Sequence, residues 1–405
     1  MKYKELEKFL YQSEETYRAE YQKRKDAETS VHIDFAIGRN RAFFVQSSEV
    51  IELMYKILRC DKEVLSLCSM LPEIAKIQYQ RKCLIDEIVL TNNIEGVHSS
   101  RKEIGDALEL LEERSSKRTG RRRFEGIVSK YRKLTLGEAL PLDTCQDIRD
   151  IYDELVLDAV VLENKQNAPD GKYFRKDSAS VYSKTGEMLH TGVDTEEKII
   201  ESMEKLLAFL KDDSIDSIYR ICLFHYMFEY IHPFYDGNGR LGRFIMSYSI
   251  SRELQPLLAY RLSETINENI GSYYKAFKTC NESRNLGDVT PFLIMMLSMI
   301  SKAEEELKTS LSSKLTLWDR YSELAAKKYP YIDSELLFVL IQASLFSETG
   351  ISIKDLVGCL GITYQTLTKR LKTVREKNLL VEKKQGKRKY FELDISLLDK
   401  KMIEN

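Results

Sequence analysis

The sequence is poor in residues that interrupt regular structure, with only 7 prolines and 18 glycines among 405 positions. Together with 43% hydrophobic and 31% charged residues, this excludes collagen-like, low-complexity and disordered chains and favours a folded, helix-rich protein. No apolar run reaches the roughly 18 uncharged residues of a membrane span, and the N-terminus lacks the apolar segment of a leader peptide. We therefore expect a soluble, cytoplasmic protein with no membrane partner.

Paired cysteines and an excess of one charge sign are also missing. The 7 cysteines are odd in number, scattered and never spaced C-x-x-C, which argues against a disulfide framework or a zinc ribbon. Lys+Arg (62) and Asp+Glu (63) leave a net charge of -1, so nucleic acid could be recognised only by a local patch. The length exceeds one average domain, and we expect an N-terminal helical region at 1–110, a core at 111–310 and a C-terminal domain at 330–400.

The spacing of apolar residues by three and four over most of the chain predicts a mainly α fold. Two segments depart from it: residues 31–37 are typical of an extended piece, and residues 171–194 predict a small β-hairpin. Ser100 and Glu103 form a capping box that starts a helix. The basic run at 114–123 is interpreted as a solvated loop without assigned function.

Residues 231–243, IHPFYDGNGRLGR, join two predicted helices, the second starting at Leu241, through a glycine-rich corner. Gly237 and Gly239 permit positive φ angles and close backbone approach, so that N–H groups can gather at the start of the second helix. That arrangement predicts an anion site. Arg240 and Arg243, three residues apart on one helix face, suit a polyphosphate better than a lone carboxylate.

Two further residues of this corner add chemistry. Asp236 supplies one hard oxygen, which is what proteins commonly offer a Mg²⁺ whose other ligands are phosphates and water. His232 provides an imidazole that could take a proton from an attacking hydroxyl. A glycine-rich turn between helices with cationic ends is the purely structural alternative, and a dinucleotide fingerprint is disfavoured because the preceding segment, 218–230, is helical rather than a strand.

The segment His-Pro-Phe-Tyr-Asp-Gly-Asn-Gly-Arg-Leu-Gly-Arg resembles the Fic family signature, H-x-F-x-[D/E]-G-N-G-R-x-x-R, at every fixed position. The resemblance implies an all-α body that transfers AMP from ATP to a protein hydroxyl and releases pyrophosphate. The roles it implies are His232 as general base, Asp236 as Mg²⁺ ligand, Asn238 as a contact to the α-phosphate, Arg240 and Arg243 as holders of the β- and γ-phosphates, and Phe234 as the anchor of the loop.

A second segment, Thr91-Asn-Asn-Ile-Glu95-Gly96, resembles the inhibitory motif of the same family, [S/T]-x-x-x-E-[G/N]. The resemblance implies autoinhibition, in which Glu95 pairs with Arg243 and competes with the γ-phosphate. Thr91 would support the helix that presents the glutamate. The alternative is an ordinary helix end at Glu95 and Gly96.

Two more segments extend the resemblance. Residues 175–193 stand where the family has its flap, a hairpin that docks the backbone of the target by strand addition, although prolines that often follow the flap are absent after His190. Residues 269–277 resemble the Tyr-Tyr segment beside the adenine pocket. Either Tyr273 or Tyr274 could stack on the base, and packing is the alternative for both.

The C-terminal part predicts helices at 334–346, 353–360 and 364–377, followed by a hairpin around 384–387, which is typical of a winged helix-turn-helix domain. Residues 351–392 carry 11 Lys/Arg against 4 Asp/Glu, a local surface suited to phosphates. Dimerisation or recognition of a protein partner is the alternative. The side chains expected to face a DNA groove are Thr363, Gln365, Thr366, Lys369 and Arg370, with Lys387 and Arg388 on the wing.

These observations predict an autoinhibited, ATP- and Mg²⁺-dependent adenylyltransferase that modifies a Ser, Thr or Tyr hydroxyl of a protein target, which could be the chain itself. Two alternatives stay open. One is removal of AMP at the same site, with Glu95 positioning a water. The other is a DNA-binding regulator whose Fic-like body senses nucleotide. The resemblance is also compatible with a homodimer.

Overall fold

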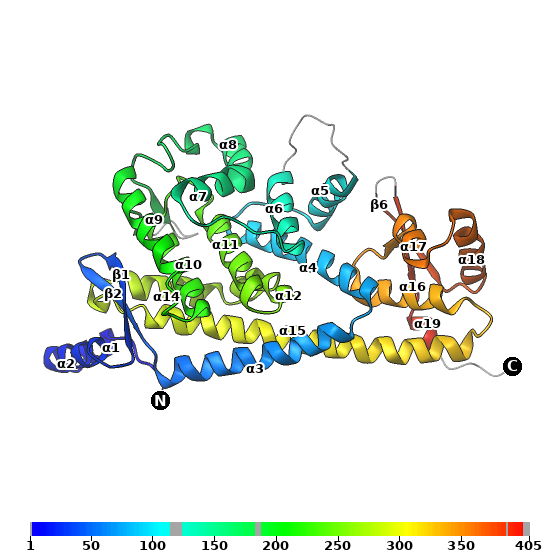
Figure 1. The fold of residues 1–405 in the computed structure, drawn as a ribbon, viewed down its shortest axis with the longest axis horizontal. Helices are drawn as coiled ribbons and strands as arrows, with labels where there is room; N and C mark the ends of the chain where they lie inside the picture. The colour runs from blue at the N-terminus through cyan, green and yellow to red at the C-terminus, as the bar shows by residue number, and fades with distance from the viewer. Residues whose placement is uncertain (1, 114–123, 183–187, 386–387, 400–405) are drawn as a thin grey trace. The chain divides into compact units, whose positions relative to one another are not determined.

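The computed structural model describes residues 2–113, 124–182, 188–385 and 388–399 (Figure 1). Helices dominate, and the strands form small antiparallel sheets, which confirms the predicted mainly α fold. Within these residues no helix is both long and apolar enough to cross a membrane.

The chain divides into two compact units. The first unit comprises Met1–Asp61 and Ile85–Glu305, and the second comprises Lys62–Leu84 and Glu306–Asn405. The long helices that contribute residues to both units are α3 (Ser48–Met70), α4 (Glu73–Ile94) and α15 (Thr290–Lys328). The domain boundaries at 110 and 330 stay predictions.

The N-terminal part of the first unit is a helical pair followed by a hairpin. Its elements are α1 (Glu7–Leu10), α2 (Glu14–Lys25), β1 (Ser30–Ile37) and β2 (Asn40–Val45). The strands pair antiparallel, and alternate residues of β1 such as Ile33 and Phe35 are buried, as expected for a strand with one face on the core. The extended segment predicted at 31–37 is therefore confirmed.

The rest of the first unit is a helical body. Its elements are α5 (Arg101–Glu113), α6 (Glu125–Thr135), α7 (Cys145–Tyr152), a π-helical turn (Asp153–Leu157), α8 (Asp158–Glu163), a 3-10 turn (Lys165–Asn167), β3 (Ser180–Tyr182), β4 (Met188–Thr191), α9 (Glu196–Leu210), α10 (Ser217–Ile231), α11 (Asn238–Glu253), α12 (Pro256–Ala259), α13 (Leu262–Glu268), α14 (Ile270–Asn281) and a 3-10 turn (Ser283–Asn285).

Helix α10 forms the centre of this body. It is apolar on all sides and almost entirely buried, so it must be covered all round. It packs against α9 and α11 (Figure 1). Because α10 and α11 are consecutive and both buried, the loop between them, which carries the predicted site, is held by the core on both sides.

Local signals predicted from the sequence are present. The Ser100 side chain accepts a hydrogen bond from the Glu103 N–H at 3.2 Å, and the Glu103 carboxylate accepts one from the Ser100 N–H at 2.9 Å, so the capping box starts α5 as predicted. All seven cysteines are free thiols, six of them buried. That agrees with the interpretation of unpaired cysteines.

The second unit contains a helical cluster with a three-stranded antiparallel sheet in the order β5-β7-β6. Its remaining elements are α16 (Ser334–Phe346), β5 (Ile351–Ser352), α17 (Ile353–Leu360), α18 (Tyr364–Glu376), β6 (Leu380–Gln385), β7 (Arg388–Leu393) and α19 (Ser396–Asp399). Leu356 and Leu367 are buried, as is Phe391 on β7. The three predicted helices and the basic hairpin are thus found where the sequence placed them. Residues 386–387 of the hairpin, including Lys387, lie outside the described residues.

Candidate functional site

The predicted site lies at the corner between α10 and α11. His232 ends α10 with φ 53° and ψ 61°, in the left-handed region, and Gly237 precedes α11 with φ 84°. A Cβ on Gly237 would also approach Val156 Cγ2 to 3.0 Å, so both backbone conformation and space favour glycine. Helix α11 begins at Asn238, before the start predicted at Leu241, because Gly237 turns the chain directly into the helix. This corrected start places Arg240 in the first turn.

Phe234 fixes the loop to the core. Its buried ring stacks on Tyr152 with centroids 3.7 Å apart and meets Phe174 edge-on at 5.5 Å. Asn238 closes the loop, because its Oδ1 accepts from the Phe234 N–H at 2.9 Å and its Nδ2 donates to the Phe234 carbonyl at 2.8 Å. The side-chain amide of Asn238 is therefore engaged within the loop. Its main-chain N–H, in the first turn of α11, is the group left to face a phosphate.

A cavity of about 330 Å³ opens at this corner and gathers residues from distant segments of the first unit. The predicted residues on its wall are Glu95, Gly96, His232, Asp236, Gly237, Asn238, Gly239, Arg243, Tyr273 and Tyr274. Thr91 and Phe234 are buried next to residues of this wall, and Arg240 is absent from it. The sequence did not predict Glu229, His190 and Val181, which also line the cavity.

Arg243 is bound by the end of α4. Its Nε donates to Thr91 Oγ1 at 2.9 Å, its Nη2 donates to the Thr91 carbonyl at 3.0 Å, and Nη2 lies 2.7 Å from Glu95 Oε1. A Cβ on Gly239 would come within 2.1 Å of Glu95 Oε1. The Glu95 carboxylate thus occupies the start of α11, where the helix favours negative charge.

Glu95 and Arg243 each stabilise the charged form of the other. Burial acts to raise the pKa of Glu95, but the charge of Arg243 outweighs it, and the pKa of the carboxyl is lowered. Burial likewise opposes the charge of Arg243, yet Glu95 raises the pKa of the guanidinium. The side chain of Glu95 keeps 28% exposure, whereas that of Arg243 keeps 2%. The pair is a charge-assisted hydrogen bond at the inner wall of an open cavity.

Arg240 differs from Arg243. Its residue is 2% exposed, its Nε and Nη2 have no hydrogen-bond partner, and its closest ion-pair contact is Asp236 Oδ1 at 3.6 Å. Arg240 lines a separate cavity of about 500 Å³, together with Asn92 and Glu154. Buried N–H groups without acceptors are costly, so this guanidinium is suited to an incoming anion.

His232 has the environment of a neutral base. Burial, and then the charges of Arg175 and His190, lower the pKa of its imidazole to about 4. Nδ1 is buried, with Glu229 Oε2 at 4.0 Å. The imidazole is therefore unprotonated at neutral pH and can accept a proton, although its basicity is lower than that of an exposed histidine.

Asp236 supplies a single carboxylate at the cavity wall. Its Oδ1 accepts from the Gly237 N–H at 2.5 Å, and its side chain is 33% exposed. In the described part of the chain, no three His, Cys, Asp or Glu side chains gather into a metal-binding group. The residues present fit a Mg²⁺ that takes most of its oxygen ligands from phosphates and water, and they do not form a protein cage.

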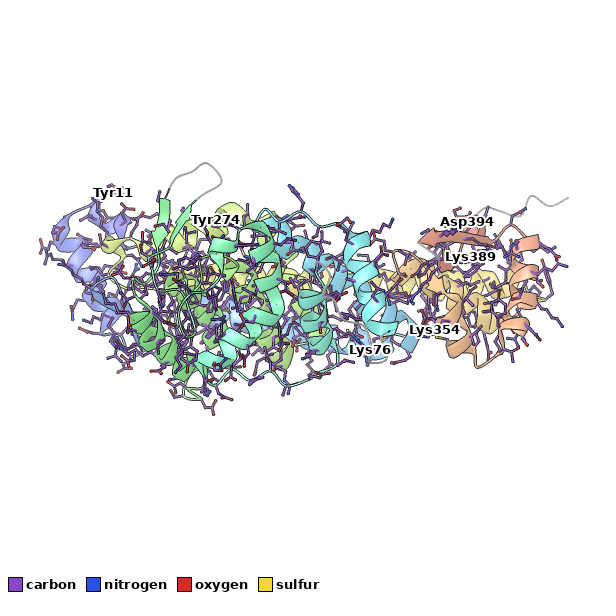
Figure 2. All side chains as sticks on the ribbon, turned by 90° about the horizontal axis from the view of Figure 1, so that it is seen from above. Tyr11, Lys76, Tyr274, Lys354, Lys389 and Asp394 are labelled. Atoms are coloured by element: carbon purple, nitrogen blue, oxygen red, sulfur yellow. The ribbon has the colours of Figure 1, made fainter. Side chains whose placement is uncertain are left out.

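The two tyrosines of α14 differ in burial. Tyr273 is 3% exposed, and its hydroxyl is 2.7 Å from His225 Nε2, so it is part of the packed wall. Tyr274 is half-buried, meets Tyr273 edge-on at 5.5 Å and lies on the side of the molecule that carries the β3–β4 hairpin (Figure 2). Tyr274 is therefore the better placed of the two to stack on a base.

The hairpin predicted at 171–194 is present, since β3 pairs antiparallel with β4. Its predicted turn, Ser183 to Gly186, lies outside the described residues, as does the basic run at 114–123. Val181 and His190 bring the hairpin to the cavity. Sequence reasoning gave no role to Arg175, just before the hairpin, and a single arginine in a loop carries no local signal of one.

In the second unit, some of the side chains predicted to face DNA make hydrogen bonds or ion pairs within the protein. Thr363 caps α18 by accepting from the Thr366 N–H at 3.3 Å, and the two hydroxyls are 3.0 Å apart. Arg370 pairs with Asp333 Oδ2 at 2.7 Å. Gln365 and Lys369 are exposed.

Comparison with known proteins connects this geometry to a family. Residues 141–250 match the Fic/DOC family. The protein adenylyltransferase fic-1 of Caenorhabditis elegans is 31% identical over 100 residues, which are 24% of this chain and 18% of that protein. The protein adenylyltransferase Fic of Drosophila grimshawi is 30% identical over 95 residues, again 24% and 18%. The chain therefore spans about a fifth of the length of these relatives.

A solved structure extends the likeness beyond the matched segment. A Fic family protein from Desulfovibrio desulfuricans G20 superposes with a TM-score of 0.51 at 19% identity and covers 86% of this chain and 96% of its own. At this identity the likeness concerns the fold.

Proposed function

We propose that the chain is a protein adenylyltransferase that moves AMP from ATP to a Ser, Thr or Tyr hydroxyl of a protein, because residues 141–250 match the Fic/DOC family and lie in a helical body. One observation carries the proposal: the neutral imidazole of His232, the carboxylate of Asp236 and the first turn of α11 line one cavity. The names of the relatives, which are protein adenylyltransferases, support the same reaction class.

The first turn of α11 would hold the triphosphate. Its leading N–H groups lack intrahelical acceptors, and the helix end favours negative charge. The guanidinium of Arg240, whose Nε and Nη2 have no hydrogen-bond partner, would bind phosphate oxygens as a fork, and that of Arg243 would do so once it is released from Glu95. Mg²⁺, when bound at Asp236, would neutralise charge that develops on the phosphates.

His232 would then act on the acceptor. Since Nδ1 is buried beside Glu229, Nε2 is the nitrogen that takes the hydroxyl proton. The hydroxyl oxygen forms a bond to the α-phosphorus, the bond from that phosphorus to the bridging oxygen breaks, and pyrophosphate leaves. Loop closure by Phe234 and Asn238 keeps the imidazole in place during the transfer.

Autoinhibition is part of the proposal. Glu95 occupies the start of α11 and uses the Arg243 guanidinium that a γ-phosphate would need. ATP in a productive position would therefore have to displace the carboxylate. The alternative, an ordinary helix end, leaves unexplained why a carboxylate lies against Gly239 and pairs with a buried arginine.

The deciding experiment uses wild type, Glu95→Gly and Glu95→Gly/His232→Ala, each incubated with Mg²⁺-ATP and a cell extract that contains potential targets. Intact-mass measurement of the chain and radiolabelled AMP on extract proteins are the readouts. Labelling that is strong in Glu95→Gly and absent in the double variant supports the proposal. Absence of label from every protein in Glu95→Gly would contradict it.

Removal of AMP from the same site is separated by the product. Glu95 lies where it could position a water against a bound AMP-protein, and then Glu95→Gly would lose activity. AMP-modified protein incubated with each variant gives free AMP in wild type alone if removal is the activity. If transfer is the activity, Glu95→Gly is instead more active than the wild type in the labelling experiment.

A second function is favoured by the exposed face of α18. With Leu367, Leu371 and Val374 buried, the face that α18 leaves exposed carries no acidic residue before Glu376. Its members are Tyr364, Gln365, Thr368, Lys369, Lys372 and Arg375, of which Arg375 pairs with Glu382. A helix face of cations and hydrogen-bonding side chains suits duplex DNA. Lys372 joins the predicted contacts, and Arg370, which pairs with Asp333, stays one of them. Binding of duplex DNA that weakens steeply with salt would test this function.

A further inference from the structure

Arg175 is a buried cation with an unusual set of partners. The residue is 0% exposed, and its guanidinium donates only to main-chain carbonyls. Among the described residues no carboxylate forms an ion pair with it. Burial consequently lowers the pKa of Arg175. Burying a charged guanidinium without a carboxylate costs free energy, so the hydrogen bonds of Arg175 are expected to hold the surrounding backbone in place.

One group of these bonds holds the end of α10. Arg175 Nε donates to the His232 carbonyl at 2.8 Å, Nη2 donates to the Ile231 carbonyl at 3.3 Å, and the Arg175 main-chain N–H donates to the Pro233 carbonyl at 3.1 Å. Three consecutive carbonyls around the left-handed His232 are thus bound by one residue. The last carbonyls of a helix need partners, and here they receive them from a cation that also matches the negative helix end.

The other bonds hold both ends of the β3–β4 hairpin. Nη1 donates to the Asp177 carbonyl at 2.5 Å, before β3, and Nη2 donates to the Val193 carbonyl at 2.7 Å, after β4. The Val193 N–H in turn donates to the Ile231 carbonyl at 3.1 Å. One planar guanidinium therefore connects the two ends of the hairpin to the residue that carries the proposed base.

Gly192 leaves room for this arrangement. A Cβ at this position would lie 2.6 Å from Arg175 Nη2 and 2.8 Å from His232 Cβ. Any side chain here would push the guanidinium away from the Val193 and Ile231 carbonyls. The position of the Arg175 guanidinium therefore depends on glycine at position 192.

We propose that Arg175 is a positioning residue that locks the left-handed backbone of His232 to both ends of the β3–β4 hairpin, so that the base and the hairpin move as one body. A target strand docked on the hairpin then meets the imidazole in a fixed geometry. The inference rests on the proposed function for its role in transfer, whereas the coupling of His232 to the hairpin is a property of the chain itself.

The guanidinium also acts on the imidazole through its charge. The groups that face His232 are Arg175, His190, Glu95 and Glu229. After burial, Arg175 is the strongest of the causes that lower the pKa of His232. Two variants separate charge from geometry, since Arg175→Lys keeps the charge and loses the planar fork, and Arg175→Gln loses both.

The test measures the chain by NMR, without any substrate. In Arg175→Lys, amide hydrogen exchange at Gly192 and Val193 speeds up while the pKa of His232 stays low. In Arg175→Gln, exchange speeds up and the pKa of His232 rises from about 4 towards 6.5. Gly192→Ala, which leaves the arginine intact, speeds up the same amides. The matched control is Arg149→Lys, because Arg149 bonds the Tyr173 carbonyl and the Asp153 carboxylate, and in the described part of the chain no hydrogen bond joins it to His232, β3 or β4.

Transfer is then measured in the Glu95→Gly background, where Arg175→Lys is expected to lower kcat for a protein acceptor about 10²-fold with little change in KM for ATP. Unchanged exchange at Gly192 and Val193 in Arg175→Lys and Gly192→Ala, with unchanged kcat, would overturn the inference. If Arg175→Gln unfolds, the other two variants decide. If the parent transfers no AMP, the proposed function fails, and the exchange and pKa measurements still decide whether Arg175 couples His232 to the hairpin.

Discussion

The N-terminal half of α11 and the exposed face of α18 both carry cations, but the cations of α11 are buried and those of α18 are exposed. On α11, Arg240 and Arg243 are 2% and 1% exposed, whereas the side chain of Lys372 on α18 is 73% exposed. A buried charge requires specific partners, so the loss of one partner has a large effect. Exposed charges are screened by solvent and salt and act additively. Variants in the two regions should therefore differ in the size of their effects.

The largest effect is expected at the base beside α11. His232→Ala in the Glu95→Gly background should lower AMP transfer about 10²- to 10⁴-fold, the usual contribution of a general base. Binding of ATP should persist, because the anion site is untouched. Initial rates with radiolabelled ATP, together with calorimetric ATP binding, give both quantities.

The matched control is His32→Ala, which removes a histidine of β1 that bonds only the Lys25 carbonyl. Its rate should equal that of the parent. Transfer by His232→Ala at the rate of this control would remove the role assigned to His232.

The second effect concerns the bond between Glu95 and Arg243. Glu95→Gly should raise transfer about 10- to 10²-fold, the value of a hydrogen bond between charged groups. Glu95→Gln, which keeps the shape and loses the charge, should fall between wild type and glycine. Rates at low ATP concentration are the measurement, since in the proposed mechanism ATP and the Glu95 carboxylate would compete for Arg243.

Glu138→Gly serves as the control for this change, because Glu138 is an exposed glutamate that does not line the cavity. Equal rates for wild type, Glu95→Gly and Glu138→Gly would contradict autoinhibition by Glu95. An increase in the transfer rate that is confined to the Glu95 variants would support the expectation that changes near α11 have larger effects than changes on α18.

A smaller effect is expected at Thr91. Thr91→Val removes the hydroxyl that accepts from Arg243 Nε at 2.9 Å but keeps the carbonyl that accepts from Nη2. Transfer should rise about 2- to 12-fold, as expected for one ordinary hydrogen bond. A rise larger than that of Glu95→Gly would show that the helix end, and not the carboxylate, restrains the site.

On α18 the effects should be small and additive. Lys369→Ala and Lys372→Ala should each reduce the salt dependence of duplex DNA binding by about one unit of slope, and the double variant by the sum. Fluorescence anisotropy at several salt concentrations provides the slopes. Arg370→Ala is the comparison, since its pairing with Asp333 predicts a smaller change in slope. Absence of any DNA binding by the wild type would contradict this use of α18.

The smallest effect is expected from pH. The proposed transfer would need the neutral imidazole of His232, whose pKa is about 4, so protonation should remove activity only as the pH falls through that value. Titration of His232 should therefore not change the transfer rate of Glu95→Gly around pH 6.5, where an unshifted histidine would be half protonated. A pH-rate profile with a step at 6.5 would show that burial and Arg175 do not set the state of His232.

Much of the site could be predicted from the sequence because its signals are local. Gly237 takes a positive φ, and Pro233 and Gly237 mark the loop within a few residues of each other. The capping box at Ser100 and the hairpin before α9 also depend on neighbouring residues. Such features follow from backbone preferences, so they do not require the rest of the fold.

Other features escaped the sequence because they depend on which distant segments meet. Arg175 gains its main-chain partners only where α10 ends near the hairpin, and the ion pair of Arg370 with Asp333 joins residues that are far apart in the sequence. Tyr273 and Tyr274 have the same residue type and both line the cavity, yet Tyr273 is buried against His225 and Tyr274 is only half-buried. The burial of a side chain depends on how distant segments pack, so neighbouring residues in the sequence do not predict it.

The sequence by itself determined the order of helices, the glycine-rich corner and the residue types that can bind phosphate, because each of these depends on neighbours along the chain. Tertiary structure alone decided that Glu95 reaches Gly239 and Arg243, that Nε and Nη2 of Arg240 have no hydrogen-bond partner, and that the pKa of His232 is lowered. The physical reason is that charge, desolvation and hydrogen bonding between distant segments act only after packing has brought those segments together.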